Sequence, residues 1–110
     1  MLSKEERKSL EDAGVTVLTS LHTLGDDVSE SLGGGPNAIV RRTLYTFSQG
    51  MKVAVECALM AADAGLLDMK SDLISIAGTN RGADTAIVLT PAFARNFQDL
   101  RIREILAKPR

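Results

Sequence analysis

The chain has 110 residues, of which 45% are hydrophobic and 25% charged, values typical of one folded domain spanning residues 1–110 and not of a disordered chain. Its formal net charge is −1, so the charge balance gives no support to a nucleic-acid-binding or membrane-surface protein. No run is long and apolar enough for a membrane span, and the first residues do not form a signal peptide.

The beginning of the chain predicts a helix followed by a strand. Ser3 and Glu6 have the spacing of a capping box, and Gly14 is suited to end the helix that they begin. The β-branched, apolar residues 15–19 predict a strand. A helix, a glycine and a strand in this order are typical of an α/β unit.

The middle of the chain is expected to be helical. Residues 26–32 predict a short helix, and the glycine run 33–36 after it is either a turn or a loop that a ligand approaches. Apolar residues recur at helical spacing over residues 37–50, which predicts a helix that ends at Gly50. Residues 51–64 are rich in alanine and apolar nearly all round, so we expect a helix buried on more than one side.

The last third of the chain predicts strands. Residues 73–77 and 85–90 are short apolar runs, and the seven residues between them are too few for a crossover helix. The two strands therefore most simply form an antiparallel hairpin, which Pro91 ends. The alternating pattern of residues 102–107 predicts a final edge strand.

The hairpin loop carries groups suited to binding an anion. Gly78 and Gly82 allow backbone N–H groups to turn inward, and Arg81 offers a planar fork that matches phosphate or carboxylate. Asp84 is expected either to orient Arg81 or to cap the turn. A hairpin loop whose residues serve turn geometry alone is the alternative. The candidate ligand-binding residues of the loop are Gly78, Thr79, Asn80, Arg81, Gly82, Asp84 and Thr85.

His22 is the only histidine, and it follows the predicted strand 15–19. Ligands of open α/β sheets collect beyond the carboxyl ends of strands, so His22 joins the candidate ligand-binding residues, with a hydrogen-bonded structural role as the alternative. One histidine without a cysteine nearby is a poor metal site, and we expect no metal. Cys57 is the only cysteine, which excludes an intrachain disulfide; we expect it to be a buried apolar residue in a reducing, cytoplasmic setting.

Two carboxylates on the predicted helix 51–64 are candidates for acid–base chemistry. Glu56 and Asp63 lie seven residues apart and therefore on one helical face. Salt-bridge or helix-cap roles are expected for them, because nothing in the sequence indicates a shared cleft. No phosphate-binding P-loop, nucleophile elbow, zinc signature or dinucleotide-binding glycine fingerprint is present.

Four stretches, taken in order, resemble the archaeal and bacterial proteins described as pyruvate kinase C-terminal-domain-like (pyruvate kinase α/β domain). They are GMKVAVE at 50–56, MAADAG at 60–65, GADTA at 82–86 and EILAKPR at 104–110. The resemblance covers essentially the whole chain. It implies a three-layer α/β/α sandwich around a mostly parallel sheet, with a C-terminal antiparallel hairpin.

The resemblance also carries expectations about function. In pyruvate kinase this domain lacks the catalytic residues and in many members holds a regulatory sugar phosphate, partly on a hairpin loop with Trp, Arg, Pro and Gly. Arg81 and Gly82 inherit that role here, while the aromatic residue and the proline are absent. Relatives that stand alone look able to bind a phosphate-bearing ligand, with flavin mononucleotide a candidate cofactor.

Relatives usually carry a further βαβ-type half before the position of Ser3, and this N-terminal half is absent from the sequence. We therefore expect a truncated chain, a separate polypeptide that supplies the missing half, or a homo-oligomer. An exposed sheet edge and an uncovered apolar helix would favour such association.

The leading expectation is a ligand-binding or regulatory domain without pyruvate kinase activity, which holds an anionic, phosphate-bearing metabolite at residues 78–85. One alternative is a subunit of an enzyme in which His22, Arg81 and Asp84 act on a phosphorylated or flavin ligand. A structural assembly half without a working site is the other.

Overall fold

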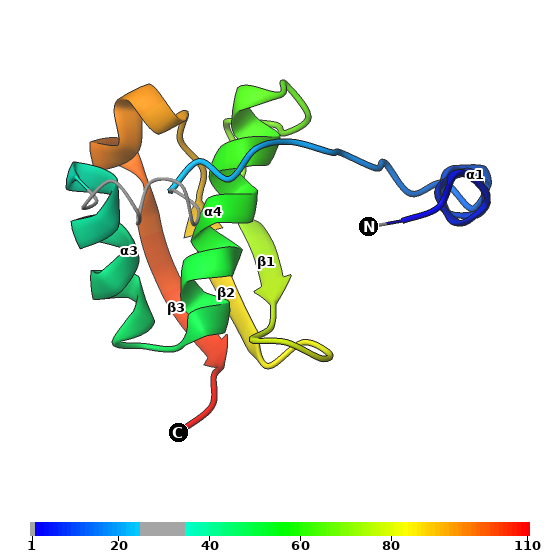
Figure 1. Ribbon diagram of the computed structural model, residues 1–110. Helices are drawn as coiled ribbons and strands as arrows, with labels where there is room; N and C mark the ends of the chain where they lie inside the picture. Colours follow the sequence, from blue (N-terminus) through cyan, green and yellow to red (C-terminus); the bar gives the residue numbers. More distant parts are fainter. Residues whose placement is uncertain (1, 25–34) are drawn as a thin grey trace.

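The structure, a computed structural model, describes residues 2–24 and 35–110, and these form a mixed α/β domain (Figure 1). The predicted helix 26–32 and the first glycines of the run 33–36 lie outside the described residues. The elements are α1 (Lys4–Asp12), α3 (Pro36–Tyr45), α4 (Gln49–Asp63), β1 (Leu73–Ala77), β2 (Thr85–Thr90), the 3-10 helix η1 (Ala94–Asp99) and β3 (Arg101–Ala107).

The three strands form one sheet in the order β1-β2-β3, and both pairs are antiparallel. β1 and β2 pair in register from Leu73 opposite Leu89 to Ala77 opposite Thr85. The predicted hairpin and the final strand are therefore confirmed. A seven-residue connection permits only a reversal of direction, which is why the sequence was sufficient here.

The core lies between α4 and one face of the sheet, and α3 packs beside α4 (Figure 1). Met51, Val55 and Leu59 on α4 meet Ile87 and Leu89 on β2, and all five are fully buried. Side chains three and four positions apart share a helix face, while alternate strand residues share a sheet face. The predicted buried helix over residues 51–64 is thus confirmed.

The prediction that a helix ends at Gly50 is wrong. α3 ends at Tyr45, and α4 begins at Gln49, where the Ser48 hydroxyl accepts a hydrogen bond of 2.9 Å from the backbone N–H of Met51. Gly50 is instead buried in the first turn of α4. A side chain at this position would overlap Thr85 on β2, so the glycine provides space for the sheet and does not end a helix.

The N-terminal arm, which we define as residues 2–20, extends away from the rest of the domain (Figure 1). Its helix α1 has the predicted capping box of Ser3 and Glu6 and is followed by Gly14 at φ +90°, but it buries none of its residues. Residues 15–19 are extended without joining the sheet, so the predicted strand is wrong. A strand exists only where a neighbour pairs with its backbone, and these residues have no neighbouring strand.

Helices cover one face of the sheet in the described part of the chain, and the other face carries Ile74 and Ile76, each 61% exposed. Every strand pair between residues 35 and 110 is antiparallel. The mixed α/β class is therefore correct, while the predicted three-layer sandwich with a mostly parallel sheet is not confirmed.

Candidate functional site

The predicted ligand loop is held closed by the carboxylate of Asp84. Its Oδ2 accepts hydrogen bonds from the Thr79 hydroxyl at 2.8 Å and the Thr79 backbone N–H at 3.3 Å. Its Oδ1 accepts one from the Thr85 hydroxyl at 2.7 Å. These hydrogen bonds stabilise the charged carboxylate and so lower the pKa of Asp84 from its ordinary value. The bond from Thr85 has the largest effect. Of its two expected roles, Asp84 therefore has the one that caps the turn.

The lowered pKa of Asp84 predicts a pH-dependent stability. A carboxyl whose pKa is lower in the folded than in the unfolded state adds stability above the unfolded value, and this stability is lost as the pH falls through the folded value. We expect Asp84→Asn to have a lower urea midpoint than the wild type at pH 7, and the difference to shrink below about pH 4. A difference that stays constant from neutral to acidic pH in far-UV circular dichroism melts would contradict this role.

The loop is also attached to the start of α4. Thr85 is buried, and its Oγ lies 2.9 Å from that of Ser48, the residue that caps α4. Because Thr85 donates its proton to Asp84, Ser48 is the donor between the two hydroxyls. A chain of hydrogen bonds thus runs from α4 through Ser48 and Thr85 to Asp84, and it fixes the position of the loop.

Arg81 is the one basic side chain on this loop, and it is exposed. In the described part of the chain, Arg81 has no hydrogen-bond or ion-pair partner. Gly82 follows it at φ +69°, a conformation that turns the chain sharply at this point. Asn80 is exposed beside Arg81, whereas the donors of Thr79 and Thr85 are engaged by Asp84. An approaching anion would therefore meet Arg81 and Asn80 first.

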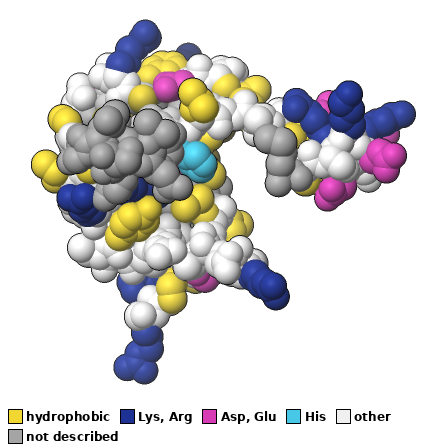
Figure 2. Space-filling view, viewed as in Figure 1, with side chains coloured by type: hydrophobic (Ala, Val, Ile, Leu, Met, Phe, Trp, Pro, Cys, Tyr) yellow, Lys and Arg dark blue, Asp and Glu magenta, His cyan; other side chains and the backbone are white. Residues whose placement is uncertain are grey.

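Two further basic residues lie at the same end of the sheet, and the sequence reasoning missed them. β3 pairs with β2 so that Ala107 lies opposite Ala86, which brings Lys108 and Arg110 to the end where the hairpin loop begins (Figure 1). Both are exposed, and Figure 2 shows basic side chains extending from this end of the molecule. The antiparallel pairing of the last strand was the available signal. Lys108 and Arg110 thus add positive charge at the end of the sheet that carries Arg81 and the ionised Asp84.

His22 is not part of this loop. Its Nδ1 lies 2.9 Å from Oε1 of Glu56 in the middle of α4, six residues beyond Gly50, where the loop contacts the helix. At 1.5 Å per residue the two places are roughly 9 Å apart along α4. His22 therefore does not contact the loop in this structure, and its hydrogen-bonded structural role is seen in the contact with Glu56.

Glu56 is the centre of a buried polar cluster. Its side chain is 1% exposed, and its carboxylate accepts hydrogen bonds of 2.9 Å from Lys52 Nζ and from the backbone N–H of Leu24. Burial alone would raise the pKa of Glu56, but the hydrogen bonds from His22, Lys52 and Leu24 and the charge of Lys52 lower it below its ordinary value. The side chain is ionised at neutral pH and attaches residues 22–24 to α4.

The His22–Glu56 contact resembles the carboxylate–imidazole pairs of catalytic sites, since bonding at Nδ1 leaves Nε2 toward solvent. His22 is not among the residues that line the four cavities described for residues 2–24 and 35–110. In the described part of the chain, the contact attaches the segment before residue 25 to α4.

Two further residues from the sequence analysis, Cys57 and Asp63, lie on α4 outside the hairpin loop. Cys57 is exposed, so the expectation that it is buried is wrong, although partial burial and the neighbouring charge of Glu56 raise the pKa of its thiol. It lies on the side of α4 that faces away from the sheet core. Asp63 accepts a hydrogen bond of 3.0 Å from the N–H of Ala94 at the start of η1, and this contact joins the end of α4 to η1.

Among residues 2–24 and 35–110, no three His, Cys, Asp or Glu side chains come together in a way that would hold a metal ion. Nor do these residues include a helix long and apolar enough to cross a membrane. No protein-family model matches the chain.

Proposed function

We propose that the chain is a ligand-binding or regulatory α/β domain that holds an anionic, phosphate-bearing metabolite at the hairpin loop 78–85. The observation that carries the proposal is the exposed, unpartnered Arg81 on a loop that Asp84 fixes to the start of α4. A guanidinium matches phosphate with two parallel hydrogen bonds, and its planar fork loses less conformational entropy per hydrogen bond than a lysine side chain does. Lys108 and Arg110 add positive charge at the same end of the sheet.

The proposal includes the resemblance to pyruvate kinase C-terminal-domain-like proteins. It also includes a three-layer sandwich for the complete assembly and flavin mononucleotide as a candidate ligand. Asp84 is a positioning residue in it, because its oxygens occupy the loop donors and its charge would repel an anion. Pyruvate kinase activity is not part of the proposal. The enzyme-subunit alternative is not favoured here, since the contact that His22 makes is with Glu56.

Isothermal titration with inorganic phosphate, fructose bisphosphate and flavin mononucleotide tests the proposal. We expect at least one of them to bind the wild type, with an affinity that falls as salt is added. Arg81→Ala should weaken that binding by about 10- to 100-fold, the effect of losing a hydrogen bond to a charged group.

Arg95→Ala is the matched control, since Arg95 lies over the ring of Phe93 in the segment that follows the opposite end of β2. Its affinity should equal that of the wild type. Absence of binding by all three probes at millimolar concentration, or equal losses in Arg81→Ala and Arg95→Ala, would refute the proposal.

A further inference from the structure

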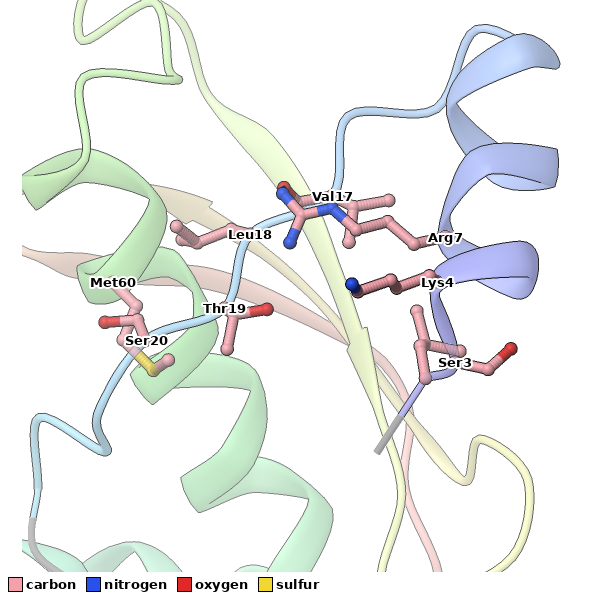
Figure 3. A pocket seen from close by; sticks show the side chains of 9 residues that line it. Ser3, Lys4, Arg7, Val17, Leu18, Thr19, Ser20 and Met60 are labelled. Carbon is pink, nitrogen blue, oxygen red and sulfur yellow. The ribbon is translucent and has the colours of Figure 1, made fainter.

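The N-terminal arm lacks the contacts that normally hold an element in place. α1 buries none of its residues, and Val15 and Leu18 on the extended segment are 47% and 39% exposed. A cleft of about 490 Å³ separates α1 and this segment from Met60 on α4 (Figure 3). Arg7 bonds to Glu11 and to the carbonyl of Val17, so these contacts remain within the arm. The arm is therefore one unit that its own domain leaves uncovered.

The sheet has a matching unsatisfied edge. Among residues 2–24 and 35–110, only β2 pairs with β1, so the other side of β1 presents backbone N–H and C=O groups that no described strand pairs with. Leu73–Ala77 contains no lysine and no proline, the residues with which proteins usually protect an edge strand. Ile74 and Ile76 on the open face of the same strand are 61% exposed. Both the edge and the face beside it are ready to accept a partner.

The exposed area is large enough for a stable dimer. A compact monomer of this mass exposes about 5,900 Å², whereas this chain exposes 7559 Å². The excess is roughly 1,600 Å² per chain, while a standard interface buries about 800 Å² on each partner. One symmetric interface would therefore remove much of the excess.

We propose that two copies of the chain exchange their N-terminal arms, so that residues 15–19 of each copy pair with the free edge of β1 in the other. Both segments are five residues long and mostly apolar; among the described residues, 15–19 pair with no strand, and β1 pairs on one side only, with β2. A reciprocal contact of this kind closes on itself in a twofold dimer. It goes beyond the proposed ligand site and uses none of its residues.

The exchange also determines where α1 of each copy lies. An arm that adds a strand beside β1 carries α1 with it, because the two are joined by two residues only. The exchange would therefore bring α1 of the second copy to the side of the sheet on which β1 forms the edge. The hydrogen bond from the Leu24 N–H to Glu56 on α4 fixes the chain just after the N-terminal arm. Residues 2–20 lie before this point and can reach the other copy.

Size-exclusion chromatography with light scattering tests the exchange on the full-length protein. The wild type should have twice the chain mass of 11.8 kDa. Ile74→Lys/Ile76→Lys places charges on the edge strand, and Val17→Pro removes a strand N–H from the arm. Each should raise the dissociation constant of the dimer at least about tenfold. Ile39→Lys, at a 68% exposed residue on α3, is the matched control and should leave the dimer intact.

Far-UV circular dichroism separates loss of assembly from loss of folding, since Val17 makes no sheet contact within its own chain. The helical signal should equal that of the wild type in all variants, and the strand signal should fall by no more than the contribution of residues 15–19. A monomeric wild type would overturn the proposal and leave the edge to a different polypeptide. A dimer that resists Val17→Pro, or one that is lost in Ile39→Lys, would also overturn it.

Discussion

Glu56→Ala is expected to lower the free energy of unfolding by about 3–5 kcal/mol, because it leaves a buried charge without its partner. The carboxylate binds Lys52 Nζ, His22 Nδ1 and the Leu24 N–H, each at 2.9 Å, and the Lys52 side chain is only 8% exposed. Domains of this size are stable by about 5–15 kcal/mol, so the loss removes a large part of the total. Urea unfolding followed by circular dichroism at one fixed protein concentration measures it.

Two controls isolate the buried charge in this experiment. Glu11→Ala removes the same side chain from an exposed pair with Arg7, and should cost less than about 1 kcal/mol. Lys52→Met/Glu56→Met removes both charges and should cost less than Glu56→Ala alone, since no unpaired ion remains. Equal losses in Glu56→Ala and Glu11→Ala would show that the cluster does not hold the fold.

Gly78→Ala is expected to destabilise the protein by about 3 kcal/mol, because the new methyl group has no room. A Cβ at this position would overlap the carbonyl oxygen of Gly82 and lie 3.0 Å from its carbonyl carbon and 3.2 Å from Ala83 Cα. These are backbone atoms, which cannot rotate away as a flexible side chain would. The loop would have to open, so ligand binding through Arg81 should weaken together with stability.

Gly82→Asn is the matched control in the same loop. A Cβ on Gly82 meets nothing within 4 Å, and the residue needs only its φ of +69°. Asparagine adopts this left-handed conformation more easily than other side chains, so the loss should stay below about 1 kcal/mol. Urea midpoints of the two variants, measured side by side, test this difference in stability. A loss of stability in Gly82→Asn as large as that in Gly78→Ala would contradict the close packing inferred for Gly78.

Elements defined by local pattern could be predicted from the sequence. The hairpin follows from a seven-residue connection between two apolar runs, and α4 follows from a length that no single strand of this domain reaches. The buried charges of α4 were also expected to have partners, which Lys52 and Glu56 provide for each other. Each of these inferences depends on neighbouring residues or on a general rule of burial.

Features that depend on distant residues could not be predicted. Residues 15–19 have the composition of a strand, but a strand also requires a second backbone beside it, and composition does not supply one. Gly50 looked like a helix end because glycine often has that position, whereas here it makes room for Thr85, 35 residues away in sequence. Propensity describes a residue and its neighbours, and packing across the fold overrides it.

The candidate site shows the same division. Residues 78–85 are contiguous, so the sequence sufficed to group them, and the capping role of Asp84 was one of two that its position allowed. His22 was grouped with them on the assumption that a parallel strand would precede it, and its actual partner is Glu56. Lys108 and Arg110 reach the site only through the register of β3 on β2, which needed the pairing itself.

The most direct test of the ligand site is a titration of isotope-labelled protein with inorganic phosphate and flavin mononucleotide, followed by amide chemical shifts. The account predicts that the largest shifts fall on residues 79–84 and on Lys108 and Arg110, and that Arg81→Ala needs about 10 to 100 times more ligand to reach half of them. Shifts centred on His22 and Glu56, or no shifts at millimolar ligand, would contradict it.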